Sequence, residues 1–412
     1  MRALHPSAAI PPPAELHRAL CGITERLARE LATPSQTAPD WSDFEWTIAR
    51  AVAAMHGISP LLSNSLRWQG PSTWTTFLAE QKTHTQARHL RIHELLLSID
   101  QKAHQAGVSV TALKGAALHE LGLYEAGDRP MADVDLLVRP VDVERSAALL
   151  MCLGFRQSEQ SWKERVFTPV DDSAAADLGE HTANSLKIEL HHRICEKLPL
   201  HLTDVSESIF PARPTAGLNR YPSNASLMRH LLLHAAGSMA FQSLRILQLH
   251  DIALLAGRMN DADWKEVMEP GRARAQPWWA YPPLELTSRY YEAGIPASVL
   301  AASKDECRFV LRASAANKSL VEVSYSYLWV KAFPGIEWSQ SIAESLRFAA
   351  TRVRPDAVHM DKRRELAASQ TWAKRAEWSS MSQGRRMLRW LISRQTRPAT
   401  MHAITAAFAY MK

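Results

Sequence analysis

Two short runs, Leu113–Gly115 (Leu-Lys-Gly) and Asp133–Val138 (Asp-Val-Asp-Leu-Leu-Val), decide the fold that this sequence predicts. In the second run two carboxylates stand two residues apart, with apolar residues between and after them. Side chains at positions i and i+2 of a strand point to the same face, so Asp133 and Asp135 are expected side by side. Their charges repel unless a cation lies between them. Mg²⁺, a hard ion that prefers oxygen ligands, is the usual partner for such a pair.

The segments around these runs predict a small unit of strands and helices. Val108–Leu113 is short, β-branched and apolar, which favours a strand, and the Lys-Gly turn then leads into a helix over Ala116–Tyr124. Asp133–Arg139 is predicted as a second strand, before a helix over residues 140–153. Leu186–His192 alternates in polarity and is predicted as a third main strand, after a hairpin over residues 155–170.

Helical patterns flank this unit on both sides, and the chain is predicted to return to helix directly after Pro199. The predicted fold class is therefore α+β, a small mixed-sheet core between N-terminal helices and a C-terminal helical bundle. The predicted segments are a flexible N-terminus (1–13), a helical N-terminal region (14–106), the α/β core (107–195), a helical domain (196–350) and a basic helical C-terminal segment (351–412).

The composition is that of a globular protein and excludes several classes. The chain has 412 residues, 46% hydrophobic and 22% charged, which is enough for about two or three domains. Its four cysteines are widely spaced and form no CxxC pair, so neither a disulfide framework nor a zinc site is expected. We expect no signal peptide and no membrane span, and hence a cytoplasmic protein.

The positive charge is concentrated near the C-terminus. Residues 351–412 hold 13 Lys/Arg and 4 Asp/Glu, a balance of +9, so the rest of the chain carries 6 − 9 = −3. Its arginines alternate with Trp372, Trp378 and Trp390, a composition that could contact a nucleic acid or another polyanion. A solvated face of amphipathic helices explains the same pattern and is the more ordinary interpretation.

Three pieces of the predicted core fit one chemistry. A helix that begins at the Lys114-Gly115 turn presents free N–H groups, and these bind phosphate well. Asp133 and Asp135 would hold metal, and Glu189 on the later strand would supply a third carboxylate. His191 shares its strand face and could compete with Glu189. Three other carboxylates in loop-like sequence are rivals for the third position: Asp172, Asp177 and Glu180.

Three carboxylates facing a phosphate-binding turn are the requirement of two-metal nucleotidyl transfer. The run Leu113–Val138, with Glu189 between two hydrophobic residues, resembles the nucleotidyltransferase superfamily with the polymerase-β-like fold. More closely, it resembles a bacterial family of uncharacterised nucleotidyltransferases with a Leu-Lys-Gly turn, an Arg and an Asp-x-Asp-Leu-Leu-Val strand. The resemblance covers residues 108–192 and extends more weakly to a helix over residues 245–252.

This resemblance implies transfer of a nucleoside monophosphate from an NTP, with ATP as the first expectation, and release of pyrophosphate. Asp133, Asp135 and Glu189 would bind Mg²⁺ or Mn²⁺, while Lys114, Gly115 and Arg129 would hold the triphosphate. Most members of the superfamily carry Gly-Ser after the first strand. Lys-Gly stands there in this chain, so triphosphate binding is expected to be organised differently.

The sequence leaves the acceptor open. Related proteins occur beside polysaccharide and modified-peptide biosynthesis genes, which suggests a sugar, a peptide side chain or a phosphorylated peptide. One alternative is a toxin-like or regulatory transferase that modifies tRNA or protein and docks through residues 351–412. Another is a degenerate scaffold that only binds nucleotide. A metal-dependent phosphohydrolase of the HD class is a weaker alternative, with candidate ligands at His230 or His234, His250, Asp251 and Asp261.

Overall fold

The structure, a computed structural model, describes residues 10–171, 178–270, 276–292, 294–355 and 381–410. The strands are β1 (Ser109–Ala112), β2 (Asp133–Val138), β3 (Phe155–Gln160), β4 (Glu164–Pro169), β5 (Lys187–His191), β6 (Cys195–Leu198), β7 (His201–Asp204) and β8 (Gly217–Asn219). The helices before β6 are α1 (Pro13–Ala32), α2 (Asp43–Met55), α3 (Ser59–Ser65), α4 (Ser72–Ala106), α5 (Gly115–Glu120), the 3₁₀ turn η1 (Pro140–Asp142) and α6 (Val143–Cys152).

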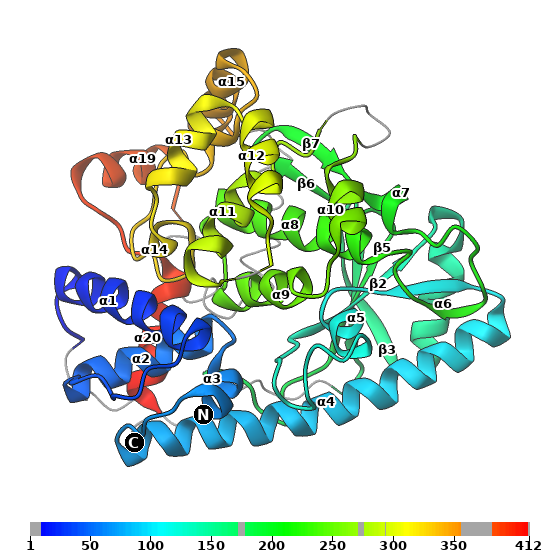
Figure 1. Ribbon diagram of the computed structural model, residues 1–412, viewed down its shortest axis with the longest axis horizontal. Coiled ribbons are helices and arrows are strands. Elements are labelled where there is room, and N and C mark those ends of the chain that lie inside the picture. Colours follow the sequence, from blue (N-terminus) through cyan, green and yellow to red (C-terminus); the bar gives the residue numbers. More distant parts are fainter. Residues whose placement is uncertain (1–9, 172–177, 271–275, 293, 356–380, 411–412) are drawn as a thin grey trace.

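The later helices lie mostly in the upper part of the molecule in Figure 1, except that α20 lies lower, beside α2. They are α7 (Ser206–Ile209), α8 (Asn224–Ala240), α9 (Ile246–Ala256), α10 (Asp261–Met268), α11 (Tyr281–Tyr290), α12 (Ala297–Glu306), α13 (Phe309–Asn317), α14 (Leu320–Val323), η2 (Ile336–Trp338), α15 (Ile342–Val353), α19 (Gln383–Ile392) and α20 (Pro398–Ala409). No helix of the described residues combines the length and the apolar character that crossing a membrane requires.

A mixed sheet of six strands, in the order β3-β4-β5-β2-β1-β8, forms the centre of the α/β core. β2 pairs in parallel with β5 and antiparallel with β1, and their register sets Asp135 directly opposite Glu189. β6 and β7 form a separate two-stranded sheet. The predicted α+β class, with helices on both sides of a small mixed sheet, is therefore confirmed.

The two faces of β2 differ in what covers them. Val134, Leu136 and Val138 point into a core that includes Ile99 of α4 and Leu150 of α6. On the opposite face Leu137 joins a small apolar cluster, and the carboxylates Asp133 and Asp135 occupy the rest of that face. Helices α8 and α9 lie on that side of the sheet (Figure 1), so the acidic pair faces the helical domain.

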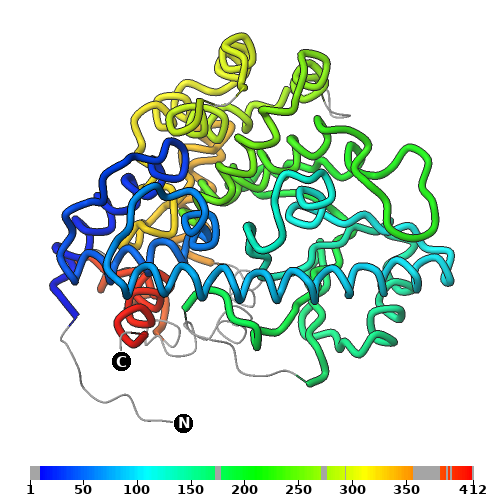
Figure 2. The backbone as a smooth tube through the Cα atoms, turned by 60° about the horizontal axis from the view of Figure 1, so that its bottom comes forward, coloured from blue at the N-terminus to red at the C-terminus, as the bar shows by residue number. Residues whose placement is uncertain are grey.

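The long helix α4 connects the N-terminal helices to the sheet. Its first turns bury Trp74 and Phe77 in the core of the N-terminal helices, and its later turns bury Ile92 and Ile99 against the sheet. A helix of 35 residues is about 50 Å long, enough to reach both cores. Figure 2 shows it running along the whole molecule. The helical region before the core is thus rigidly joined to the core.

Most predicted elements appear within a few residues of their expected bounds. Helix α2 begins directly after Ser42, because Ser42 and Glu45 form a capping box there. The prediction of helix directly after Pro199 is wrong, since β7 and β8 precede α8. β8 has only three residues and pairs in parallel with β1. It begins at Gly217, whose φ is +96° and where a Cβ would collide with His104. Such a short strand has no periodicity to detect.

Cys21, Cys152, Cys195 and Cys307 are all unpaired in the structure. The structure describes only part of the C-terminal segment 351–412, which the sequence suggested could contact a polyanion. Trp372 and Trp378 lie outside the described residues, as does most of the basic run around them. In the described part of this segment, Arg397 donates to the carbonyls of Gln242 and Ser324 instead of facing solvent.

A fully buried histidine connects the N-terminal helices to α9. The backbone N–H of Ile246 donates to His56 Nδ1 at 3.0 Å, so Nε2 carries the proton and donates to Ser326 Oγ at 2.8 Å. Thr24 of α1 donates to the same hydroxyl at 2.7 Å. Burial, aided by the charge of Arg245, lowers the pKa of His56 to about 3, so the ring is neutral in the folded protein.

The fold should therefore lose stability on mild acidification through this residue. The unfolded chain takes up a proton at His56 near pH 6.5, whereas the folded chain resists protonation until about pH 3. We expect His56 alone to lower the free energy of unfolding by about 2 kcal/mol between pH 7 and pH 5. In His56→Asn this part of the loss should disappear, as measured by urea unfolding. The exposed His93→Asn variant is the control, and an unchanged pH slope in His56→Asn would contradict the assignment.

Candidate functional site

One pocket of about 320 Å³ brings together every site residue that the sequence predicted. It lies where the ends of β1 and β2 meet helices α8 and α9. Its predicted lining residues are Lys114, Gly115, Arg129, Asp133, Asp135 and Glu189. The strand order explains the convergence, because β1, β2 and β5 are neighbours in the sheet.

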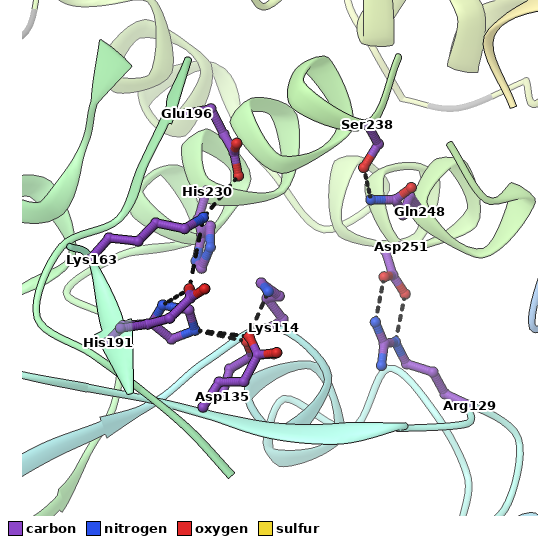
Figure 3. A network of polar contacts seen from close by, with 12 residues as sticks. Lys114, Arg129, Asp135, Lys163, His191, Glu196, His230, Ser238, Gln248 and Asp251 are labelled. Atoms are coloured by element: carbon purple, nitrogen blue, oxygen red, sulfur yellow. Dashed lines mark hydrogen bonds and ion pairs between the residues drawn. The ribbon is translucent and has the colours of Figure 1, made fainter. Parts of the chain in front are cut away.

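Asp135 is the centre of a compact polar cluster, drawn in Figure 3. Lys114 Nζ lies 2.9 Å from Asp135 Oδ1, and His191 Nε2 lies 3.0 Å from the same oxygen. The same His191 nitrogen is 3.5 Å from Glu189 Oε2. Ligand atoms of Asp135, Glu189 and His191 all lie within 4.8 Å of one another, which is close enough to surround one metal ion.

The two aspartates of β2 have opposite electrostatic environments. Burial and the negative charges of Asp135 and Glu189 raise the pKa of Asp133 to about 7, against the opposing charges of Lys114 and Arg245. Burial would also raise the pKa of Asp135, but Lys114 and the hydrogen bond from His191 outweigh it and hold that pKa well below its usual range. Asp135 is thus ionised, while Asp133 lacks a cation of its own.

His191 is a cation in this arrangement. Burial alone would lower its pKa, but hydrogen bonds to Asp135, Glu164 and Glu189 raise it to about 10. Its second nitrogen, Nδ1, lies 3.1 Å from Glu164 Oε2, so both ring nitrogens donate. With both ring nitrogens donating, neither has a free lone pair in this arrangement. The ring therefore orients Asp135 by hydrogen bonding.

The donors that remain fit a hard cation. Asp133, Asp135 and Glu189 offer carboxylate oxygens, the ligands that suit Mg²⁺ and Mn²⁺. Of the rival carboxylates, Asp172 and Asp177 lie outside the described residues. Glu180 pairs with Arg88 at 2.7 Å and is not part of the donor cluster.

Lys114 has a strained backbone at the turn between β1 and α5. Its φ is +45° and its ψ is −111°, a conformation that side-chain-bearing residues rarely adopt and that costs on the order of 1–3 kcal/mol. The turn is supported by Tyr221, whose hydroxyl accepts the Lys114 N–H at 3.3 Å and contacts His230 Nδ1 at 2.7 Å. This conformation brings the ammonium group to Asp135.

Gly115 and Arg129 are packed against each other. A Cβ at Gly115 would lie 2.2 Å from Arg129 Nη1 and 2.9 Å from the Met131 side chain. The glycine is therefore required by this close approach. Arg129 in turn donates from Nε and Nη2 to both oxygens of Asp251 in α9, at 2.8 and 2.7 Å (Figure 3). Tyr124 also donates to Asp251, at 2.7 Å. The buried pair fixes α9 to the loop before β2.

The ligand set of the phosphohydrolase alternative is not assembled. Asp251 is paired with Arg129. His230 contacts Tyr221, and the ring of His250 packs between Tyr124 and Tyr291. Within the described ranges, the only group of donors close enough to hold a metal is that of Asp135, Glu189 and His191.

Sequence reasoning did not place three further lining residues in this site, although His234 was considered as a ligand of the phosphohydrolase alternative. His234 of α8, Arg245 at the start of α9 and Tyr325 after α14 all line the pocket. They are more than 90 residues from β2 in sequence, and no motif joins them to the acidic run. The unusual helix start at Arg245 was visible, but its position beside the sheet depends on tertiary packing.

Breaking the Arg129–Asp251 pair should be costly, since it leaves a buried guanidinium without a counter-charge. We expect Asp251→Leu to lower the free energy of unfolding by about 3–5 kcal/mol. The double variant Arg129→Met/Asp251→Leu should recover much of this loss. Urea unfolding of both variants, with the exposed carboxylate variant Asp261→Ala as control, measures the difference. If the single and double variants are equally unstable, the pair is not what holds α9.

Comparison with known proteins gives one match. Residues 42–290 match a family model described as an uncharacterised nucleotidyltransferase. No curated protein and no solved structure matches the chain. The matched range covers more than half of the chain and contains α2 to α11, the entire mixed sheet and every pocket residue except Tyr325. The chain therefore belongs to the family of uncharacterised nucleotidyltransferases.

Proposed function

We propose that this protein transfers a nucleoside monophosphate from an NTP, with ATP as the first candidate, to an acceptor and releases pyrophosphate. The observation that carries the proposal is that Asp133, Asp135 and Glu189 line one pocket together with Lys114. These three carboxylates would hold Mg²⁺ or Mn²⁺. When bound, the metal would neutralise phosphate charge and lower the pKa of the acceptor hydroxyl.

The protein's residues would position the reactants. The acceptor oxygen forms a bond to the α-phosphorus, the α–β phosphoanhydride bond breaks, and pyrophosphate leaves with the negative charge. Glu189, which is partly exposed to the pocket, would take the acceptor proton. His191 would keep Asp135 oriented throughout. Lys114, Gly115 and Arg129 remain our proposed triphosphate-binding set, with Arg129 acting mainly by supporting the turn at Gly115.

A nucleotide-binding scaffold without turnover is the second candidate. Its support is that Asp135 already has two cationic partners, Lys114 and His191, so this carboxylate is neutralised by the protein itself. A metal would have to compete with both. The two candidates differ in whether a bound NTP is converted, and both require nucleotide binding in the same pocket.

Asparagine at either aspartate should remove metal binding and transfer together. We expect Asp133→Asn and Asp135→Asn each to lower transfer by about 100-fold or more, because one charge-neutralising ligand is lost. The assay combines purified protein, MgCl₂ or MnCl₂, each α-labelled NTP and a panel of sugars, peptides, phosphopeptides and tRNA. Labelled acceptor and released pyrophosphate are measured, and Mn²⁺ binding is followed separately by calorimetry.

The exposed carboxylate variant Asp171→Asn is the matched control. Full Mn²⁺ binding by Asp135→Asn would overturn the proposed metal site. Tight binding of NTP and Mn²⁺ by the unaltered protein, with no pyrophosphate released for any acceptor, would favour the scaffold.

A further inference from the structure

The positive charges that line the pocket are not equally available to a ligand. Lys114 is paired with Asp135, and Arg129 is paired with Asp251. The third cation, Arg245, is exposed. Among the residues that the structure describes, none forms an ion pair or hydrogen bond with the Arg245 guanidinium. A phosphate entering the pocket would therefore meet one cation that needs no release from a carboxylate.

Arg245 lies over the face of an aromatic ring. Its guanidinium carbon is 5.5 Å from the centre of the Tyr325 ring, which also lines the pocket. The backbone enforces this contact, because Leu244 N–H donates to the Val323 carbonyl and Tyr325 N–H donates to the Leu244 carbonyl. Stacking on an aromatic face leaves the edge of the guanidinium, where its N–H donors lie, free to bind an anion.

At the start of α9, the side chain of Arg245 is available to a ligand and the backbone N–H groups are not. The N–H of Ile246 donates to His56 Nδ1, and the N–H of Leu247 donates to the His56 carbonyl at 3.4 Å. The N–H of Arg245 itself donates to Gln248 Oε1 at 2.9 Å. These backbone donors are already used, so the guanidinium is the group that this helix end offers to the pocket.

Both partners of the stack are supported from behind. His56 binds the residue after Arg245 and also Ser326, the residue after Tyr325. A second arginine, Arg397, also lies over the Tyr325 ring, 5.9 Å from the ring centre, and donates to the carbonyls of Gln242 and Ser324. Segments from four distant parts of the chain thus hold one exposed guanidinium in place. An arginine without a function at this point would not need such support.

We propose that Arg245, stacked on Tyr325, binds the β- and γ-phosphates of the NTP, the part that leaves as pyrophosphate. This inference rests on the proposed nucleotidyl transfer. When the α–β bond breaks, negative charge grows on the β-phosphate oxygen, and a planar guanidinium can neutralise it with two parallel hydrogen bonds. The carboxylates from β2 and β5 would hold metal and α-phosphate, while α9 would hold the leaving group.

The test compares ligands that differ in their phosphates. Calorimetry with MgCl₂ measures binding of α,β-methylene ATP, which nucleotidyl transfer cannot cleave, and of AMP. We expect Arg245→Ala to weaken binding of the triphosphate by about tenfold or more, the typical value of a charge-assisted phosphate contact, and to change AMP binding less than twofold. Arg245→Lys should lose an intermediate amount, because it keeps the charge without the planar fork.

Further variants separate the stack from general damage. Tyr325→Phe keeps the aromatic face and should bind like the unaltered protein, whereas Tyr325→Ala should resemble Arg245→Lys. The exposed Arg213→Ala, which lies outside the pocket lining, is the matched control for loss of one positive charge. Mn²⁺ binding measured without nucleotide should be unchanged in Arg245→Ala, because this residue is not a metal ligand.

The outcomes distinguish the two proposals. Unaltered protein that binds neither nucleotide would overturn the proposed function and this inference with it. Normal triphosphate binding by Arg245→Ala, or an equal loss for triphosphate and AMP, would overturn the inference alone and leave the proposed function standing. A loss confined to the triphosphate supports the role of Arg245.

Discussion

The buried carboxylate of Asp135 sets the arrangement of the site. Burying a charge is costly unless it is paired and hydrogen-bonded, and Asp135 is only 6% exposed. Lys114 and His191 meet this requirement from two sides, which fixes the turn after β1 and the side-chain order on β5. The other ring nitrogen of His191 contacts Glu164 on β4. The contacts that begin at Asp135 thus link four neighbouring strands, β4, β5, β2 and β1.

The opposite side of the pocket depends on a second buried charge pair. Arg129 and Asp251 join the loop before β2 to α9, and Gly115 packs against the arginine. The helical domain is therefore fixed relative to the sheet at the point where the pocket opens. The matched family range likewise continues past the sheet to the end of α11. A sheet alone would lack one wall of its own pocket.

The sequence predicted the sheet centre well because its signals are local. The alternation around Asp133 and Glu189, and the strand-turn-helix pattern at Lys114, need only a few consecutive residues to be visible. Contacts between distant residues were not visible in the sequence. Arg129 and Asp251, and likewise Arg245 and Tyr325, stand about 80 to 120 residues apart. His191 was recognised as a competitor of Glu189, but its bonds to Asp135 and Glu164 depend on strand register. The three-residue β8 left no pattern to read.

The last helix of the chain lies against some of the first. α20 packs on α2, with Phe408 beside Phe44 and Tyr410 edge-on to Phe77 of α4. During synthesis the N-terminal helices emerge long before α20 exists, so their apolar surface stays incomplete until α20 has been made. The α/β core, by contrast, can assemble as soon as β8 appears. The N-terminal helices are therefore synthesised first, but their packing is completed only after that of the α/β core.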